Sequence, residues 1–401
     1  MLRSAGRDAP TKPREEKDST EEKDSTGRWV VPLSDVLVDG EMERAVAEVV
    51  RSGWWSMGPR VAEFERSFGE LCDVKHSFAV ANGTAALHLA LLAIGCGPGD
   101  EVLVPSLTFV AAANSIAHTG ATPVFCDVIG PHDLTVDPAD LEAAVGPNTR
   151  AILVMHYGGH ACHMDEILEL ATRHGLPVIE DAAHAPGGEF RGRACGTLGA
   201  VGCFSFFSNK NLPMGEGGMV VTQDDELAKR IGLFRSHGMT TLTWDRHRGH
   251  ASGYDVVLRG FNYRLDELRA ALGIVELERL QERNRARGQI VERYRTALDG
   301  VAGISMPFAT RPEVLAAHHL AVIVLPEGRT RQEVEPAIIA RGVQTSVHYP
   351  PIHRFSAYSD PSQRSLPVTD LVADRLLTLP LFPHITDAQV SAVIEAVLAS
   401  V

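Results

Sequence analysis

The chain has 401 residues with 44% hydrophobic content and a formal net charge of −13, from 38 basic and 51 acidic side chains. This length exceeds what one hydrophobic core usually sustains, so we expect a large domain and a smaller one, and the negative charge disfavours nucleic acid or an anionic membrane surface as the main partner. No apolar run approaches the roughly 20 residues that span a bilayer, and the N-terminus lacks an apolar signal core. The six cysteines show no CxxC pairing. We therefore expect a soluble cytoplasmic protein with free thiols.

Residues 1–28 are rich in charged and hydroxyl side chains. They contain the hexamer EEKDST twice in tandem, at residues 15–20 and 21–26. A repeat without an apolar residue has nothing to bury in a core. We therefore predict that residues 1–28 form a disordered tail.

Residues 29–265 show the alternation of strands and helices that is typical of a large α/β domain. Helical periodicity covers residues 84–94 and 164–173, and Asp137 followed by Pro138 predicts a further helix start. Continuous apolar runs between helices indicate the buried strands of a mostly parallel sheet. These runs are SFAV, EVLVP, TPVFCDV, AILVMH, LPVIED, VGCFSFF and GMVVT, between residues 77 and 222.

Residues 266–401 begin with a long helical stretch that ends near Leu298, which we interpret as the connector between the domains. A strand (HLAVIVL), a helix, a second strand (VQTSVHY) and a final helix follow. This order predicts a compact, smaller α+β domain at the C-terminus. Pairs with capping-box spacing open its two helices, Thr330 with Glu333 and Thr386 with Gln389.

A single lysine follows the apolar run VGCFSFF. The segment FSFFSNKNLPMGEGG, residues 204–218, places Lys210 in a loop of small residues ahead of a glycine cluster that favours a tight turn. Packing rarely requires a lysine at the end of a core strand. Burial beside an apolar or cationic environment lowers the pKa of a lysine amine, which lets the amine attack an aldehyde and hold it as a Schiff base. A surface lysine is the alternative interpretation.

Gly83 and Thr84 open a helix directly after a strand, in ANGTAALHLALL. The first turn of a helix has backbone N–H groups without partners and carries the positive end of the helix dipole. Both features favour a bound phosphate. Many strand-turn-helix units share this pattern, so it indicates a phosphate site only in combination with other motifs.

Acidic side chains end another apolar run, in VIEDAAHAPG. Asp181 follows Glu180 there, and His184 comes three residues later. In an open α/β sheet the carboxyl end of a strand faces the ligand crevice. A carboxylate in that place can keep the pyridine nitrogen of pyridoxal 5′-phosphate (PLP) protonated, so that the ring accepts electrons from a substrate carbanion. The alternative is that Asp181 caps a following helix.

These three segments, with the lysine last, resemble the DegT/DnrJ/EryC1/StrS family of PLP-dependent sugar aminotransferases. The resemblance covers about residues 29–400 and rests on the order and spacing of the motifs. It implies an α/β fold of the aspartate-aminotransferase type (fold type I), with a mostly parallel central sheet and a smaller α+β C-terminal domain. Further matching segments are RSGWWSMGPRVAEFE (51–65), VPSLTFVAAANSI (104–116), GFNYRLDELRAALG (260–273) and SVHYPPIH (346–353).

The resemblance implies a cofactor site. Lys210 is the implied Schiff-base lysine, and Asp181 is the implied partner of the pyridine nitrogen. His184 matches a position near the phenolic oxygen of the cofactor, and Phe109 matches the aromatic residue that stacks on its ring. The implied phosphate contacts are the helix start at Gly83, Thr84 and Ala85 and the hydroxyl of Ser205.

The resemblance also implies a homodimer with shared active sites. Asn262, in GFNYR, matches the residue that reaches the phosphate of the neighbouring subunit's cofactor. His348 and Tyr349, in SVHYPPIH, are candidate substrate contacts. Trp54 is a third candidate, with a packing role as the alternative.

The implied reaction is amino transfer in two halves. Glutamate or glutamine would convert PLP to pyridoxamine 5′-phosphate, and this form would aminate a keto-sugar, expected to be nucleotide-linked, in amino-sugar or natural-product biosynthesis. Lys210 would shuttle the proton in both halves. Relatives that dehydrate the sugar carry histidine at this position, so the lysine favours transamination.

Three other functions stay open from the sequence. They are amination of a free cyclitol, a dehydration like that of the aminohydroxybenzoate synthases, and a non-catalytic regulatory role on the same fold. The amino donor, the keto acceptor and the carbon that is aminated are not fixed by these motifs. We expect acceptor specificity in the insertion-like stretch at residues 240–257.

The segment HYGGHACH brings His156, His160, Cys162 and His163 close together in the sequence. A zinc site would require fixed ligand pairings and a separate second ligand half, which the sequence lacks. We therefore predict no metal.

Overall fold

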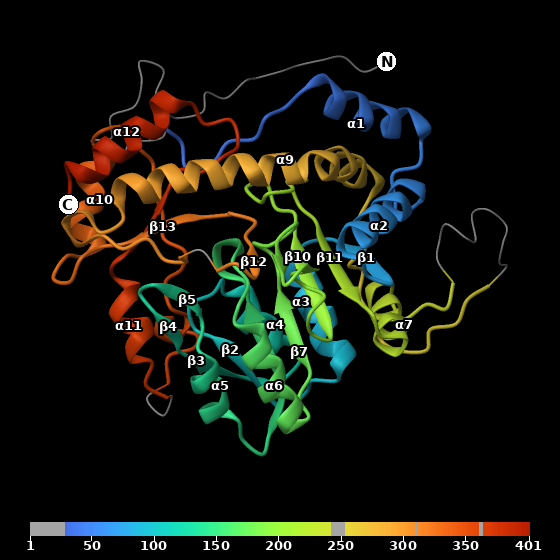
Figure 1. Ribbon diagram of the computed structural model, residues 1–401. Coiled ribbons are helices and arrows are strands. Elements are labelled where there is room, and N and C mark those ends of the chain that lie inside the picture. The colour runs from blue at the N-terminus through green and yellow to red at the C-terminus, as the bar shows by residue number, and fades with distance from the viewer. Residues whose placement is uncertain (1–28, 242–252, 310, 361–363) are drawn as a thin grey trace, which may run out of the picture.

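The computed structural model describes residues 29–241, 253–309, 311–360 and 364–401 (Figure 1). The predicted tail at residues 1–28 lies outside these ranges, and so do residues 242–252 of the predicted specificity stretch. Among the helices of the described ranges, none combines the length and the apolar character that crossing a membrane requires.

A seven-stranded mixed sheet forms the centre of the molecule, in the order β1-β11-β10-β7-β6-β2-β3. β11 runs antiparallel to β1 and β10, and the other neighbouring pairs are parallel. The predicted mostly parallel sheet is confirmed, and each of the seven apolar runs supplies one strand. The strands are β1 (His76–Val80), β2 (Glu101–Pro105), β3 (Thr122–Cys126), β6 (Thr149–Met155), β7 (Val178–Asp181), β10 (Val201–Ser205) and β11 (Gly218–Thr222).

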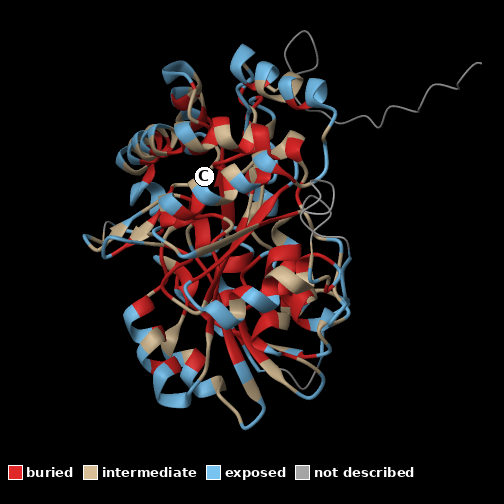
Figure 2. Cartoon of the chain, turned by 90° about the vertical axis from the view of Figure 1, so that its right-hand side faces the viewer, coloured by how far each residue is buried: buried red, intermediate tan, exposed pale blue. Residues whose placement is uncertain are grey.

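Helices cover both faces of this sheet. On β2, Val102 and Val104 belong to one hydrophobic core and Leu103 to the other, because successive side chains of a strand point to opposite faces. Figure 2 shows the buried residues in the middle of the molecule and the exposed ones on its outer helices. One core is closed by α3 (Gly83–Ile94), α4 (Ala111–His118) and α7 (Asp225–Arg235), the other by α2 (Pro59–Cys72), α5 (Pro138–Ala144), α6 (Met164–His174) and the first half of α9 (Glu267–Leu298).

The predicted helix starts are confirmed by their caps. The Asp137 carboxylate accepts the Ala139 N–H at the start of α5, and the Asp266 carboxylate accepts the Arg269 N–H at the start of α9. Both predicted capping boxes are present, at the starts of α10 (Arg331–Ile339) and α12 (Asp387–Leu398).

The 32-residue helix α9 links the two parts of the molecule. Its first half packs against α2 and α1 (Gly40–Ser52), and its second half lies beside α12 (Figure 1). Ala270 and Leu280 enter a core of the central sheet, whereas Ile290 and Leu298 enter the core of the C-terminal part. One helix therefore contributes to two cores.

The C-terminal part is built on β13 (Ala321–Val324) and β14 (Leu376–Leu379), which pair antiparallel. Val31 belongs to the same core. Its N–H donates to the Gly342 carbonyl at 3.1 Å, and its carbonyl accepts the Gln344 N–H at 3.0 Å. The segment around Val31, which we placed with residues 29–265, thus packs with the C-terminal part instead.

The prediction of a regular strand in VQTSVHY is wrong. The structure describes all of residues 343–349 and forms only isolated bridges there, from Val343 to Val31 and from Ser346 to Thr378. Two prolines follow at residues 350 and 351, and proline has no N–H to donate to a ladder. The chain then crosses to the large part, where the Ile352 N–H donates to the Ser106 carbonyl at 3.0 Å.

The remaining elements are short. α11 (Pro367–Ala373) packs on β4. Two small sheets pair β4 (Val128–Gly130) with β5 (Asp133–Val136), and β8 (Glu189–Phe190) with β9 (Arg193–Ala194) and β12 (Val314–Leu315).

Candidate active site

A cavity of about 400 Å³, called here the lysine cavity, opens at the carboxyl ends of the parallel strands. Parallel strands present these ends at one edge of a sheet, so residues far apart in the sequence meet there. β7 ends at Asp181, and β10 ends at Ser205. The predicted residues that line the lysine cavity are Gly83, Thr84, Phe109, Asp181, His184, Ser205, Lys210, His348 and Tyr349.

Lys210 lies in the loop that follows β10. Burial lowers the pKa of its amine to about 8, and the negative charge of Asp181 partly opposes this shift. A lysine with an ordinary pKa is almost entirely protonated at neutral pH, whereas an amine with a pKa near 8 is a nucleophile in a usable fraction of molecules. The structure therefore provides a reactive amine opposite an acid.

His319 contacts this amine and was missed from the sequence. Its Nε2 lies 3.5 Å from the Lys210 Nζ, and its Nδ1 lies 2.9 Å from the Asn211 Oδ1. The Asn211 amide donates to the Asn284 Oδ1 at 2.8 Å and to the Ala317 carbonyl at 2.7 Å. The Oδ1 of Asn211 is thus an acceptor, which places the proton of a neutral His319 ring on Nδ1.

The other nitrogen of His319 then offers a lone pair to Lys210. Burial holds the pKa of His319 well below its ordinary value, and the charge of Lys210 acts in the same direction. The ring is therefore neutral at physiological pH. The signal in the sequence was weak, since His319 begins the apolar run HLAVIVL and Asn211 simply follows the lysine.

Asp181 is 5% exposed, and its Oδ1 accepts the Ala183 N–H at 3.1 Å. Burial raises the pKa of this carboxyl, while the Ala183 N–H and the charge of Lys210 lower it. No helix begins between residues 182 and 224, all of which the structure describes, so the alternative role as a helix cap has no helix to serve. The carboxylate of Asp181 can therefore accept further hydrogen bonds.

His184 and Tyr349 form a hydrogen-bonded pair in the lysine cavity. The Gly158 N–H donates to the His184 Nδ1 at 3.3 Å, and the His184 Nε2 lies 2.9 Å from the Tyr349 oxygen. Burial lowers the pKa of His184 and raises that of Tyr349, so both side chains are neutral. In this tautomer the His184 Nε2–H donates to Tyr349, which leaves the phenolic proton of Tyr349 for another acceptor.

Phe109 and His348 complete the described wall. Phe109 is 53% exposed, and its ring lies 5.6 Å from the Tyr349 ring, measured between centroids. The His348 Nδ1 lies 2.9 Å from the Thr378 Oγ1, and burial lowers the pKa of His348 to about 4. An exposed aromatic face and a neutral histidine therefore border the cavity.

The start of α3 approaches Ser205 closely. A Cβ on Gly83 would lie 2.8 Å from the Ser205 Cβ, so only glycine fits there without a shift. The Ala85 N–H donates to the Asn82 side chain at 2.8 Å, which is an N-cap that we did not predict. Hence Ala85, assigned to the phosphate by resemblance, has its N–H occupied, whereas those of Gly83 and Thr84 find no acceptor among the described residues.

Asn262 and Trp54 do not line the lysine cavity. Asn262 is exposed and forms an isolated bridge with Ser236. The Trp54 Nε1–H donates to the Met57 carbonyl at 3.4 Å, close to Gly58. A single copy of the chain brings neither side chain to Lys210.

The side chains of HYGGHACH take separate partners. The His156 Nε2 lies 2.8 Å from the Glu180 Oε2, the His163 Nε2 lies 3.0 Å from the Asp133 Oδ2, and the His160 ring stacks on Phe308 with centroids 4.2 Å apart. Among the residues that the structure describes, no group of three or more metal-ligand side chains converges. All six cysteines are buried free thiols, as expected.

The lysine cavity matches the parts of PLP. Lys210 offers an amine for the aldehyde, and the described residues place no lysine or arginine in ion-pair contact with Asp181, which can therefore serve the ring nitrogen. The exposed face of Phe109 can cover the ring. The start of α3 and the Ser205 hydroxyl can receive the phosphate.

Comparison with known proteins agrees with this chemistry. The sequence pattern of the DegT/DnrJ/EryC1/StrS aminotransferase family matches residues 37–398. The spore coat polysaccharide biosynthesis protein SpsC of Bacillus subtilis is 42% identical over 92% of this chain and 96% of its own. GDP-perosamine synthase of Caulobacter vibrioides is 40% identical over 90% of this chain and 95% of its own.

A solved structure shows the same fold. The crystal structure of S. venezuelae DesV in complex with a ketimine intermediate superposes with a TM-score of 0.82 at 39% identity, covering 90% of this chain and 94% of that one. This likeness confirms the predicted fold type I architecture with its mostly parallel sheet. From the family match, the close relatives and the geometry of the lysine cavity, it follows that this protein belongs to the DegT/DnrJ/EryC1/StrS family of PLP-dependent aminotransferases.

Proposed function

We propose that this chain transfers an amino group from glutamate or glutamine to a nucleotide-linked keto-sugar, with PLP and pyridoxamine 5′-phosphate as the two forms of its cofactor. The observation that carries the proposal is the Lys210 amine, whose pKa is lowered to about 8 and which shares with Asp181 a cavity that fits PLP. The relative named GDP-perosamine synthase supports a nucleotide-linked sugar as the acceptor.

Bound PLP supplies an electron sink for the negative charge that develops at the substrate carbon. Asp181, oriented by the Ala183 N–H, would hold the proton of the ring nitrogen. Lys210 would bind the cofactor covalently, leave it when the amine of the donor arrives, and then move a proton at the reacting carbon. The lone pair on the His319 Nε2 would hold the freed amine in place between these steps.

A second copy of the chain completes the site in this proposal. Asn262 is exposed and lies outside the lysine cavity of its own chain. Phe109 borders that cavity and is about half exposed. A two-fold dimer would bring Asn262 to the phosphate of the partner's cofactor.

The test is the visible absorption of the purified protein with PLP, recorded before and after addition of glutamate or glutamine. The proposal expects a visible band that bleaches with one of the donors. Lys210→Ala should lose catalytic turnover by roughly 10³-fold or more, because the same amine binds the cofactor and moves the proton. Its melting temperature should match that of the wild type.

The other outcomes separate the alternatives. A protein that shows the band but keeps it with both donors would favour the dehydration chemistry. A protein that takes up no PLP, or a Lys210→Ala variant with full turnover, would overturn the site assignment itself.

A further inference from the structure

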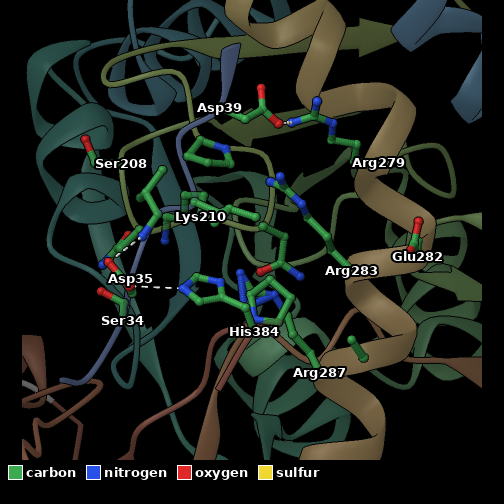
Figure 3. Close-up of a pocket in the computed structure, with 17 residues that line it drawn as sticks. Ser34, Asp35, Asp39, Ser208, Lys210, Arg279, Glu282, Arg283, Arg287 and His384 are labelled. Atoms are coloured by element: carbon green, nitrogen blue, oxygen red, sulfur yellow. Dashed lines mark hydrogen bonds and ion pairs between the residues drawn. The ribbon is translucent and has the colours of Figure 1, made fainter. Parts of the chain in front are cut away.

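A second cavity, called here the arginine cavity, adjoins the lysine cavity. Its volume is about 420 Å³, and Lys210 and Asn209 line both cavities. Figure 3 shows that α9 forms one wall, from which Arg279, Arg283 and Arg287 extend. The other walls are the segment 34–39, the loop 208–213 and residues 383–384.

The three arginines lie on one face of α9, because residues four apart in a helix lie one above the other. Two of them already have carboxylate partners. Arg279 lies 2.8 Å from an Asp39 oxygen and also pairs with Glu41, and Arg283 pairs with the buried Glu276. Arg279 and Arg283 therefore already have carboxylate partners in the absence of a ligand.

Arg287 differs from its neighbours. It is 6% exposed, and within the described residues its one hydrogen bond is a long contact of 3.4 Å from Nη1 to the Leu381 carbonyl. Its Nε is buried and finds no acceptor among the described residues. Burial lowers the pKa of Arg287 to about 10, the nearby charge of Arg283 acts in the same direction, and the charge of Glu276, which is paired with Arg283, opposes the shift only in part.

The remaining acids of the cavity do not neutralise Arg287. Asp35 lies 3.0 Å from the His384 Nε2 and so has a partner of its own. Glu282 is exposed, and no ion pair joins it to Arg287 within the described part of the chain. A buried guanidinium without an anion costs stability, so its presence in a cavity indicates a negatively charged ligand.

We propose that the arginine cavity binds an anionic group of a substrate, a carboxylate or a phosphate, with Arg287 as its main contact and Arg283 beside it. A guanidinium fork can give such an oxygen pair two parallel hydrogen bonds. Lys210 borders both cavities, so the anion would belong to a molecule that also reaches the lysine. The identity of the anion rests on the proposed function, which offers two sources: a carboxylate of the amino donor and the phosphate of a nucleotide-linked acceptor.

Binding of inorganic phosphate and of glutarate to the PLP-loaded protein, measured by calorimetry, tests the site without any turnover. Arg287→Met should weaken binding of at least one of these anions by roughly 10-fold or more, because a charge-assisted pair is lost. Arg285→Gln is the matched control, since Arg285 is exposed on the same helix and does not line the cavity. It should bind both anions as the wild type does.

Two results would overturn the proposal. One is equal binding of both anions to the wild type and to folded Arg287→Met. If Arg287→Met does not fold, Arg287→Lys replaces it, because lysine keeps the charge but lacks the two parallel donors of the guanidinium. An unchanged affinity of Arg287→Lys for both anions is the other overturning result, since it would show that the guanidinium is not a ligand.

The half-reaction with glutamate then identifies the source. A higher KM for glutamate with an unchanged kcat in Arg287→Met would assign the anion to the donor. An unchanged half-reaction together with weaker phosphate binding would assign it to the acceptor. If glutamate and glutamine both failed as donors, the proposed function would fall, while the phosphate measurement would still decide whether Arg287 binds an anion.

Discussion

Two neighbouring acids on β7 serve different regions of the molecule. Glu180 points into the core, where its Oε1 accepts the N–H groups of Leu198 and Gly199 at 2.7 and 2.6 Å. Its Oε2 accepts the Gly196 N–H at 2.7 Å and faces the His156 Nε2 at 2.8 Å. Asp181, on the opposite face, accepts one backbone N–H and borders the lysine cavity.

The difference shows how an acid with a structural role can be told from an acid with a chemical one. Every strong acceptor position of Glu180 is used by the protein, so this carboxylate fixes the loop at residues 196–199 and has nothing left for a ligand. Burial raises the pKa of Asp181, and the described residues give its carboxylate only one hydrogen bond in return. A buried group that is left incompletely satisfied beside a cavity is a candidate for function.

Of the substitutions that test this comparison, Asp181→Asn has the largest expected effect, which is second only to that of Lys210→Ala. The amide can still accept the Ala183 N–H but cannot hold a proton on the ring nitrogen of the cofactor, so kcat/KM for amino transfer should fall by roughly 10²–10³-fold. Stability should stay the same or rise, since burial disfavours the charged form that is removed. Steady-state kinetics measures the loss of kcat/KM, and thermal unfolding measures the stability. A fall in both kcat/KM and stability would make Asp181 a structural residue like Glu180.

Glu180→Gln should show the opposite behaviour. Its amide group would place donors against the Gly196 N–H and the His156 Nε2, so the free energy of unfolding should drop by about 2–4 kcal/mol. Denaturant unfolding measures this drop. Activity per folded molecule should remain near that of the wild type, and a selective loss of turnover without loss of stability would erase the distinction between the two acids.

His319→Leu tests the contact between His319 and Lys210 through pH. In the wild type, uptake of PLP by the apoprotein should rise with pH around the Lys210 pKa of about 8, because the neutral amine is the nucleophile. Loss of the Nε2 acceptor destabilises the ammonium, so the midpoint should move below pH 8 and turnover should fall by about 10-fold. In His319→Gln the amide oxygen can accept a hydrogen bond from Lys210, so the midpoint should return part of the way toward pH 8. Equal midpoints in all three proteins would remove His319 from the site.

The smallest expected effect is that of Asn262→Ala, which should weaken retention of PLP by roughly 5-fold through the loss of one hydrogen bond. Equilibrium dialysis measures the retention. Mixing this variant with Lys210→Ala supplies the sharper result, because a mixed dimer would contain one site with both the lysine and the asparagine. Tight PLP binding in the mixture would support the shared site, and its absence would count against the dimer.

Much of the fold could be predicted because it depends on local patterns. The seven apolar runs, the cap at Asp137, the long helix from Glu267 and both capping boxes depend on residues that lie close together in the sequence. The strand expected in VQTSVHY failed for the opposite reason. Its β-branched residues favour extended backbone, but a ladder needs a continuous partner, and residues 31 and 378 each provide only a bridge.

The sequence by itself determined the residues at the carboxyl ends of the strands, and with them Lys210 and Asp181, because the end of an apolar run is a local signal. Only the tertiary structure decided what surrounds them. His319 lies 109 residues from Lys210 in the chain, and its contact depends on the crossing of the C-terminal part over the sheet. In the sequence Arg287 is one more charge on a helix, and it is set apart only by its burial without an ion-pair partner among the residues that the structure describes. Burial and hydrogen-bond satisfaction are sums over distant neighbours, which no local pattern contains.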